Sequence, residues 1–149
     1  MSGINRVALF GKLNSLGYKA IESATVFCKM RGNPHVELVH WFNQILQEQD
    51  SDLHQIINHF ELNIPKIAQD LTTALDKLPR GATSISNLSP YIEDAVERGW
   101  VYGTLAFGET QVRTGHLMVG LLGTQGLEQT LLNISKEFGK IKLEQLQDS

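Results

Sequence analysis

The sequence predicts an all-α protein in which a four-helix unit occurs twice, as a pseudo-twofold duplicated bundle with an extra helix at the N-terminus. Apolar residues recur mostly at three- and four-residue spacing, the period of an amphipathic helix. No long stretch alternates strictly between apolar and polar residues, as a half-buried strand would. The third observation is a near copy: VELVHWFNQILQ at residues 36–47 returns as VRTGHLMVGLLG at residues 112–123.

Start and stop signals place the helices of the first half. Gly32-Asn33-Pro34 ends one helix, because proline disfavours helix in the residue before it and glycine suits a C-terminal cap. Ser51 is an expected N-cap, and Asp52 follows it at the favourable end of the helix dipole. The expected helices cover residues 4–11, 15–31, 36–49, 52–60 and 64–78.

Residues 79–89, PRGATSISNLS, form the expected linker between the halves, because they lack a helical stripe and are rich in turn-forming residues. Ser89 then caps a helix that has Pro90 at its first position, where the missing N–H of proline costs nothing. The expected helices of the second half cover residues 90–106, 114–122, 127–134 and 140–146.

The two halves follow the same order of elements. At an offset of 76 residues Val36 matches Val112 and His40 matches His116, whereas residues 21–24 match residues 92–95 at an offset of 71. The second half should therefore carry about five extra residues between the matched blocks. Since each half is too small to bury its own apolar faces, we expect one domain over residues 1–149. Its parts are an extra helix (1–12), repeat 1 (13–78), a linker (79–89) and repeat 2 (90–149).

Composition favours a globular protein and excludes several classes of function. The chain has 42 % hydrophobic and 19 % charged residues, a net charge of −3 and scattered basic residues, so nucleic-acid binding is not expected. No apolar run is long enough to span a membrane, and the first residues do not have the pattern of a secretory signal. With a single cysteine, Cys28, these features lead us to expect a cytoplasmic protein.

No catalytic or metal-binding motif is found. His35 and His40 are five residues apart, as are His54 and His59, which turns each pair to different helix faces. Neither GxSxG nor a phosphate-binding GxxxxGK[ST] loop occurs, so we expect no catalytic residue, metal or cofactor in this chain. An enzyme that uses Cys28 or the histidines remains the alternative from another class.

His40 and His116 are better explained as scaffold. Each lies in the first turn of an expected helix whose next residues are apolar. There the imidazole can pack against the core and donate to a neighbouring backbone carbonyl. We therefore interpret the pair as markers of the repeat.

A duplicated helical domain with V-x-x-x-H opening the second helix of each half resembles the N-terminal domain of the Clp/Hsp100 family of AAA+ unfoldases. The resemblance covers residues 13–146. Within the family, CKMRGNPHVELVHWFNQIL, SDLHQIINHFEL and LPRGATSISNLSP are most similar to the branch that serves bacterial type VI secretion.

The resemblance implies a function in substrate recognition. The parent would be a homohexamer whose N-terminal domain binds a helix near the N-terminus of the larger sheath subunit, and whose ATPase modules then disassemble the contracted sheath. ATP and Mg²⁺ would bind in those AAA+ modules, which this chain lacks. Two alternatives stay open: a general unfoldase domain that binds adaptors or exposed hydrophobic segments, and a spacer that stabilises the ring. As an isolated domain, the chain is expected to be a monomer.

An amphipathic target helix would bind in a groove with apolar residues that the core does not use. The short first helix is surplus to the two repeats, and pseudo-symmetry predicts that its neighbours are the linker and the start of the second half. Tyr91 is attractive because a phenol can bury its ring and keep its hydroxyl in water. The predicted groove residues are Ile4, Val7, Phe10, Leu13, Ile85, Leu88, Tyr91 and Ile92.

Overall fold

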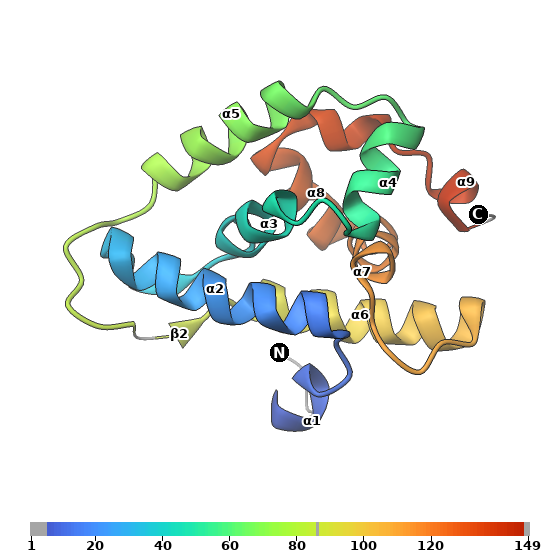
Figure 1. Ribbon diagram of the computed structural model, residues 1–149, viewed down its shortest axis with the longest axis horizontal. Helices are drawn as coiled ribbons and strands as arrows, with labels where there is room; N and C mark the ends of the chain where they lie inside the picture. The colour runs from blue at the N-terminus through green and yellow to red at the C-terminus, as the bar shows by residue number, and fades with distance from the viewer. Residues whose placement is uncertain (1–5, 86, 148–149) are drawn as a thin grey trace.

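The chain folds into a helical bundle in which the long helices α2 and α6 run side by side and the remaining helices cover them (Figure 1). The computed structural model describes residues 6–85 and 87–147. Its helices are α1 (Arg6–Phe10), α2 (Ser15–Arg31), α3 (Leu38–Gln47), α4 (Asp52–His59), α5 (Ile64–Asp76), α6 (Pro90–Phe107), α7 (Thr114–Leu122), α8 (Gln125–Ile134) and α9 (Leu143–Gln147). The prediction of an all-α fold is confirmed. No helix in this part of the chain is long and apolar enough for a membrane crossing.

Two short strands and a 3-10 turn depart from the predicted elements. Strand β1 (His35–Val36) pairs in parallel with β2 (Asn87–Leu88), so the helix start predicted at Val36 and the uniform linker are both wrong in detail. Two residues are too few to show an alternating pattern. A 3-10 helix, η1 (Lys136–Lys140), replaces the predicted start of the last helix, which begins at Leu143.

The pairing of these extended residues interlocks the two halves. In repeat 1 the Val36 carbonyl accepts from the Ser89 N–H at 2.8 Å, and Leu88 lies opposite Val36. In repeat 2 the Val112 carbonyl accepts from the Asn14 N–H at 2.9 Å, and Leu13 lies opposite Val112. Each half thus contributes the residue before its long helix to the segment before the other half's second helix.

Caps and burial give the register of the duplication. Helices α2 and α6 have the N-caps Asn14 and Ser89, which are 75 residues apart. The C-cap glycines Gly32 and Gly108 both adopt φ near +70° and are 76 residues apart. The predicted offset of 71 is therefore wrong by about one helical turn, and α6 carries one extra residue in place of five. At an offset of 75 the buried positions coincide: Gly17 with Ile92, Ala20 with Ala95, Ala24 with Gly99, and Cys28 with Gly103.

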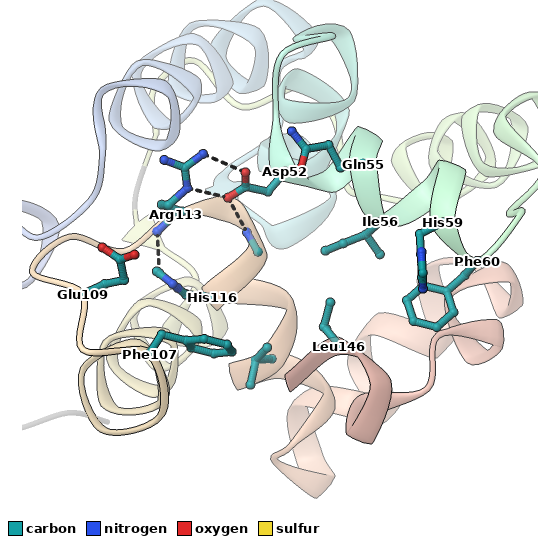
Figure 2. A pocket seen from close by; sticks show the side chains of 12 residues that line it. Asp52, Gln55, Ile56, His59, Phe60, Phe107, Glu109, Arg113, His116 and Leu146 are labelled. Carbon is teal, nitrogen blue, oxygen red and sulfur yellow. Dashed lines mark hydrogen bonds and ion pairs between the residues drawn. The ribbon is translucent and has the colours of Figure 1, made fainter. Parts of the chain in front are cut away.

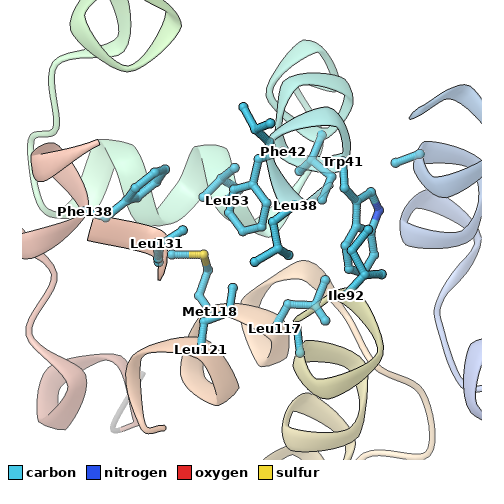
Figure 3. Close-up of a cluster of buried hydrophobic side chains, with 14 of the residues drawn as sticks. Leu38, Trp41, Phe42, Leu53, Ile92, Leu117, Met118, Leu121, Leu131 and Phe138 are labelled. Atoms are coloured by element: carbon cyan, nitrogen blue, oxygen red, sulfur yellow. The ribbon is translucent and has the colours of Figure 1, made fainter. Parts of the chain in front are cut away.

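The core lies between α3 and α7, the helices that carry the duplicated stretches (Figure 3). Trp41 is fully buried and its indole Nε1 donates to the Gly17 carbonyl at 3.2 Å, which ties α3 to α2. Phe42 meets Phe138 edge to face, with ring centroids 5.9 Å apart. The packing joins both halves into one hydrophobic core.

Candidate functional site

Helix α1 is held on α6 and presents apolar side chains outward. Leu9 is buried, which fixes α1 on the bundle, while Phe10 is half-buried against the core. Val7 is 84 % exposed. Ile4, which was predicted to extend this face, lies outside the described residues. The described part of α1 therefore offers Val7 and Phe10 to a ligand.

The other predicted groove residues do not join α1 in one surface. Leu13 is 5 % and Ile92 is 0 % exposed, so both belong to the core and offer no surface in this conformation. Leu88 is half-buried in β2, and Ile85 is half-buried nearby in the linker. Tyr91 is half-exposed and lines a hollow with Thr124 and Leu127 on the side of α6 that faces α8.

His40 is a structural residue, as predicted, but its hydrogen bond runs in the opposite direction. Its Nδ1 accepts from the Glu37 N–H at 2.8 Å, so the ring caps the start of α3. Its Nε2 lies 2.9 Å from the Asn33 Oδ1. Since Nδ1 accepts, the neutral ring carries its proton on Nε2 and donates it to Asn33. Burial, with the nearby positive charge of Arg31, lowers the pKa of His40 to about 4.

His116 repeats this cap at the start of α7. Its Nδ1 accepts from the Arg113 N–H at 3.0 Å, and the ring lies against Phe107 with centroids 5.4 Å apart. Burial lowers the pKa of His116, although the carboxylates of Glu109 and Asp52 oppose that shift. Both histidines are therefore neutral caps at pH 7, which supports their interpretation as repeat markers.

Cys28 has the environment of a packing residue. The thiol is fully buried and donates to the carbonyls of Asn33 and His35 at 3.3 and 3.2 Å. Burial, with the negative charge of Glu37, raises the pKa of the Cys28 thiol. Because the thiolate is the reactive form, this site does not favour nucleophilic chemistry. The described residues contain no cluster of three metal-ligating side chains.

The structure also forms a hollow beside His116 that sequence reasoning missed (Figure 2). It has a volume of about 430 Å³ and lies between α4, α7, α9 and the C-terminal end of α6. We call it the His116 hollow. Its apolar wall includes Ile56, Phe60, Phe107, Val119 and Leu146, and its polar rim includes Asp52, Gln55, His59, Glu109 and Arg113. These residues come from separate elements, so no sequence spacing connects them.

An ion pair across the rim of this hollow joins the two repeats. The Arg113 guanidinium donates to both carboxylate oxygens of Asp52, from Nε at 2.9 Å and from Nη2 at 2.8 Å. Burial alone would raise the pKa of Asp52, but the hydrogen bonds from Arg113 and from the Gly115 N–H outweigh it and lower that pKa. The carboxylate is therefore charged at neutral pH and bound to the other half.

We expect a double-mutant cycle of Arg113→Ala and Asp52→Asn to give a coupling energy of about 1 kcal/mol in the free energy of unfolding. The value is modest because half of the Arg113 side chain is in solvent, although Asp52 is mostly buried. Urea titrations of the four proteins measure it. Additive single effects would show that the bidentate pair does not stabilise the contact between the repeats.

Comparison with known proteins agrees with this architecture. The model of the Clp repeat (R) N-terminal domain matches residues 15–135. The AAA+ ATPase ClpV1 of Pseudomonas aeruginosa is 65 % identical over 146 residues, which are 98 % of this chain and 16 % of that relative. The chain thus spans about a sixth of its relative's length.

Two solved structures share the fold. One comes from a study of the coevolution of the ATPase ClpV, the TssB-TssC sheath and the accessory HsiE protein in type VI secretion. It is 64 % identical with a TM-score of 0.95, over 99 % of this chain and 91 % of that one. The other is a complex of a ClpV N-domain with a VipB peptide, at 20 % identity and a TM-score of 0.83, over 99 % of this chain and 89 % of that one.

Proposed function

This chain belongs to the Clp repeat N-terminal domain family, and we propose that it is the substrate-recognition domain of a longer AAA+ ATPase of type VI secretion. In this proposal it binds a helix near the N-terminus of the larger sheath subunit and directs ATP-driven disassembly of the contracted sheath. The 65 % identity to ClpV1 supports the assignment, and a domain of the same fold binds a VipB peptide.

The parent protein would act as a cytoplasmic homohexamer. ATP and Mg²⁺ would bind in AAA+ modules outside this chain, which has no phosphate-binding loop of its own. Six tethered copies would convert a modest affinity of each domain into strong binding to the sheath. The isolated domain would be a monomer, which analytical ultracentrifugation can check.

The observation that carries the proposed binding mode is the apolar outer face of α1. This helix has no counterpart in the duplicated unit, so the bundle does not need its outer side chains for packing. An amphipathic helix gains most of its binding energy from a few apolar anchors. Val7 and Phe10 can receive such anchors, and we propose Ile85, Leu88 and Tyr91 for the far end of the target helix. Leu13 and Ile92 would support this surface from the core.

We expect Val7→Asp and Phe10→Asp each to weaken binding of a labelled peptide from the N-terminus of the sheath subunit by about tenfold or more. A carboxylate on this face would have to be desolvated when an apolar helix binds. Fluorescence anisotropy measures the dissociation constant. Leu105→Asp is a matched control, because Leu105 is 82 % exposed on α6 and outside the proposed surface.

The same titration separates the proposed function from its alternatives. If unrelated unfolded proteins compete with the peptide, the domain is a general acceptor of hydrophobic segments. If the peptide does not bind saturably, or the variants bind as tightly as the wild type, the α1 surface is not the site. A spacer role predicts that deletion of this domain abolishes ring assembly along with peptide binding.

A further inference from the structure

The two repeats differ in what covers the end of their long helix. In repeat 1 the linker crosses the C-cap of α2, where the Ala82 N–H donates to the Gly32 carbonyl at 2.9 Å. A Cβ on Gly32 would lie 3.2 Å from the Gly81 nitrogen, whereas one on the equivalent Gly108 would meet nothing within 4 Å. The C-cap of α6 is thus open where that of α2 is covered.

The covered site shows which chemistry fits beside the capping histidine. The Asn33 carboxamide lies between the ring and the linker: its Oδ1 accepts from His40 Nε2, and its Nδ2 donates to the Pro79 carbonyl at 2.8 Å. His40 is fully buried under this arrangement, and Phe27 packs edge to face on its ring. A carboxamide and an extended peptide segment therefore complete the site in repeat 1.

Glu109 occupies the position of Asn33 in repeat 2. Both residues follow the C-cap glycine, and both donate their N–H into the last turn, from Asn33 to Cys28 and from Glu109 to Gly103. The side chain of Glu109 is exposed on the rim of the His116 hollow. The Gln111 carbonyl lies near the ring, but among residues 6–85 and 87–147 no hydrogen bond to His116 Nε2 is found.

The hollow beside this nitrogen combines one polar point with an apolar wall. Since Nδ1 of His116 accepts from the Arg113 N–H, the neutral ring presents an N–H donor at Nε2. Phe107 lies beside the ring, and Ile56 and Leu146 lie deeper in the hollow (Figure 2). A carbonyl oxygen bound to Nε2 would place an attached side chain against this wall.

We propose that the His116 hollow is a second binding site, which accepts an extended segment of a partner protein. In this site a peptide or carboxamide oxygen accepts from His116 Nε2, and an adjacent apolar side chain packs against Phe107 and Val119. The segment takes the place that Asn33 and Pro79 fill in repeat 1. The site is distinct from the α1 surface and goes beyond the binding of the sheath helix.

The first test uses a minimal probe, N-acetyl-leucine amide, titrated into the isotope-labelled chain and followed by NMR. We expect saturable shifts of the His116 ring and of the Phe107 and Val119 resonances. N-acetyl-glycine amide has the same amide groups without the apolar side chain and should bind about tenfold more weakly. Shifts that do not saturate, or that are equal for both probes, would overturn the proposal.

Glu109→Asn provides a second test, with a gain as its readout. It gives repeat 2 the residue of repeat 1, so the new carboxamide should accept from His116 Nε2. We expect the melting temperature to rise by about 2–5 °C and the affinity for the probe to fall by about tenfold. Glu48→Asn, an equal charge change at an exposed site, should do neither. If Glu109→Asn leaves the probe affinity unchanged, the carbonyl contact is wrong, and unchanged binding in Val7→Asp would confirm that the two sites are separate.

Discussion

Gly120→Ala should destabilise the domain by about 3 kcal/mol or more, or prevent folding altogether. A Cβ at this position in α7 would lie 2.6 Å from the backbone nitrogen of Gly99 and 2.8 Å from the carbonyl carbon of Arg98. These are main-chain atoms within α6, so they cannot rotate away as a side chain would. The two helices would have to separate, and the packing on both sides of the contact would be lost.

The matched control is Gly126→Ala in the first turn of α8. A Cβ there meets nothing within 4 Å, so only the higher helix propensity of alanine remains, which should stabilise the domain by about 0.5–1 kcal/mol. Urea unfolding followed by circular dichroism measures both changes. If Gly120→Ala stays within about 1 kcal/mol of the wild type, the close approach of α6 and α7 is not needed for stability.

This helix contact matters for both proposed binding sites. Helix α6 carries α1 on one side and contributes Phe107 to the His116 hollow, while α7 contributes His116 itself. A variant that separates α6 from α7 would therefore disturb both sites. Substitutions that probe binding are better placed at surface positions such as Val7 and Glu109, which leave the contact intact.

Local signals predicted most of the helices, because each bound depends on a few neighbouring residues. Ser51, Ser89 with Pro90, and the Gly32 stop all act as expected. The register of α2 on α6 was harder, since a slip of one turn keeps apolar residues on the same face. The caps decide it, and they were not used to align the repeats.

The binding surfaces were less predictable because exposure depends on the partners of a helix. Phe10 and Ile92 are both apolar residues on short-period stripes, yet one reaches the surface and the other lies in the core. The isolation of α1 from the duplicated unit could be recognised from the repeat itself. The His116 hollow could not, because its walls meet only after α4 and α9 have packed on α7.

The domain should lose up to about 3 kcal/mol of stability as the pH falls from about 6.5 to 4, and His40 should account for most of this loss. The pKa of His40 is about 4 in the folded protein, against 6.5 for an ordinary histidine. Between these values the unfolded chain binds a proton that the folded chain does not, so acid favours unfolding. Protonation would also end the acceptance of the Glu37 N–H by Nδ1. Burial lowers the pKa of His116 as well, which adds a loss of the same sign.

His40→Gln separates this effect from general acid denaturation. The glutamine carbonyl can accept from the Glu37 N–H, as in an ordinary capping box, but the side chain does not titrate. Its unfolding free energy should therefore change much less between pH 7 and 4.5 than that of the wild type, whatever its stability at neutral pH. The lowered pKa values of Asp52 and Asp70 lie below 3.8, so their loss of stability falls mainly below this window. Equal pH slopes for the two proteins would mean that the buried imidazole does not set the acid sensitivity, and that the cap tolerates a charged ring.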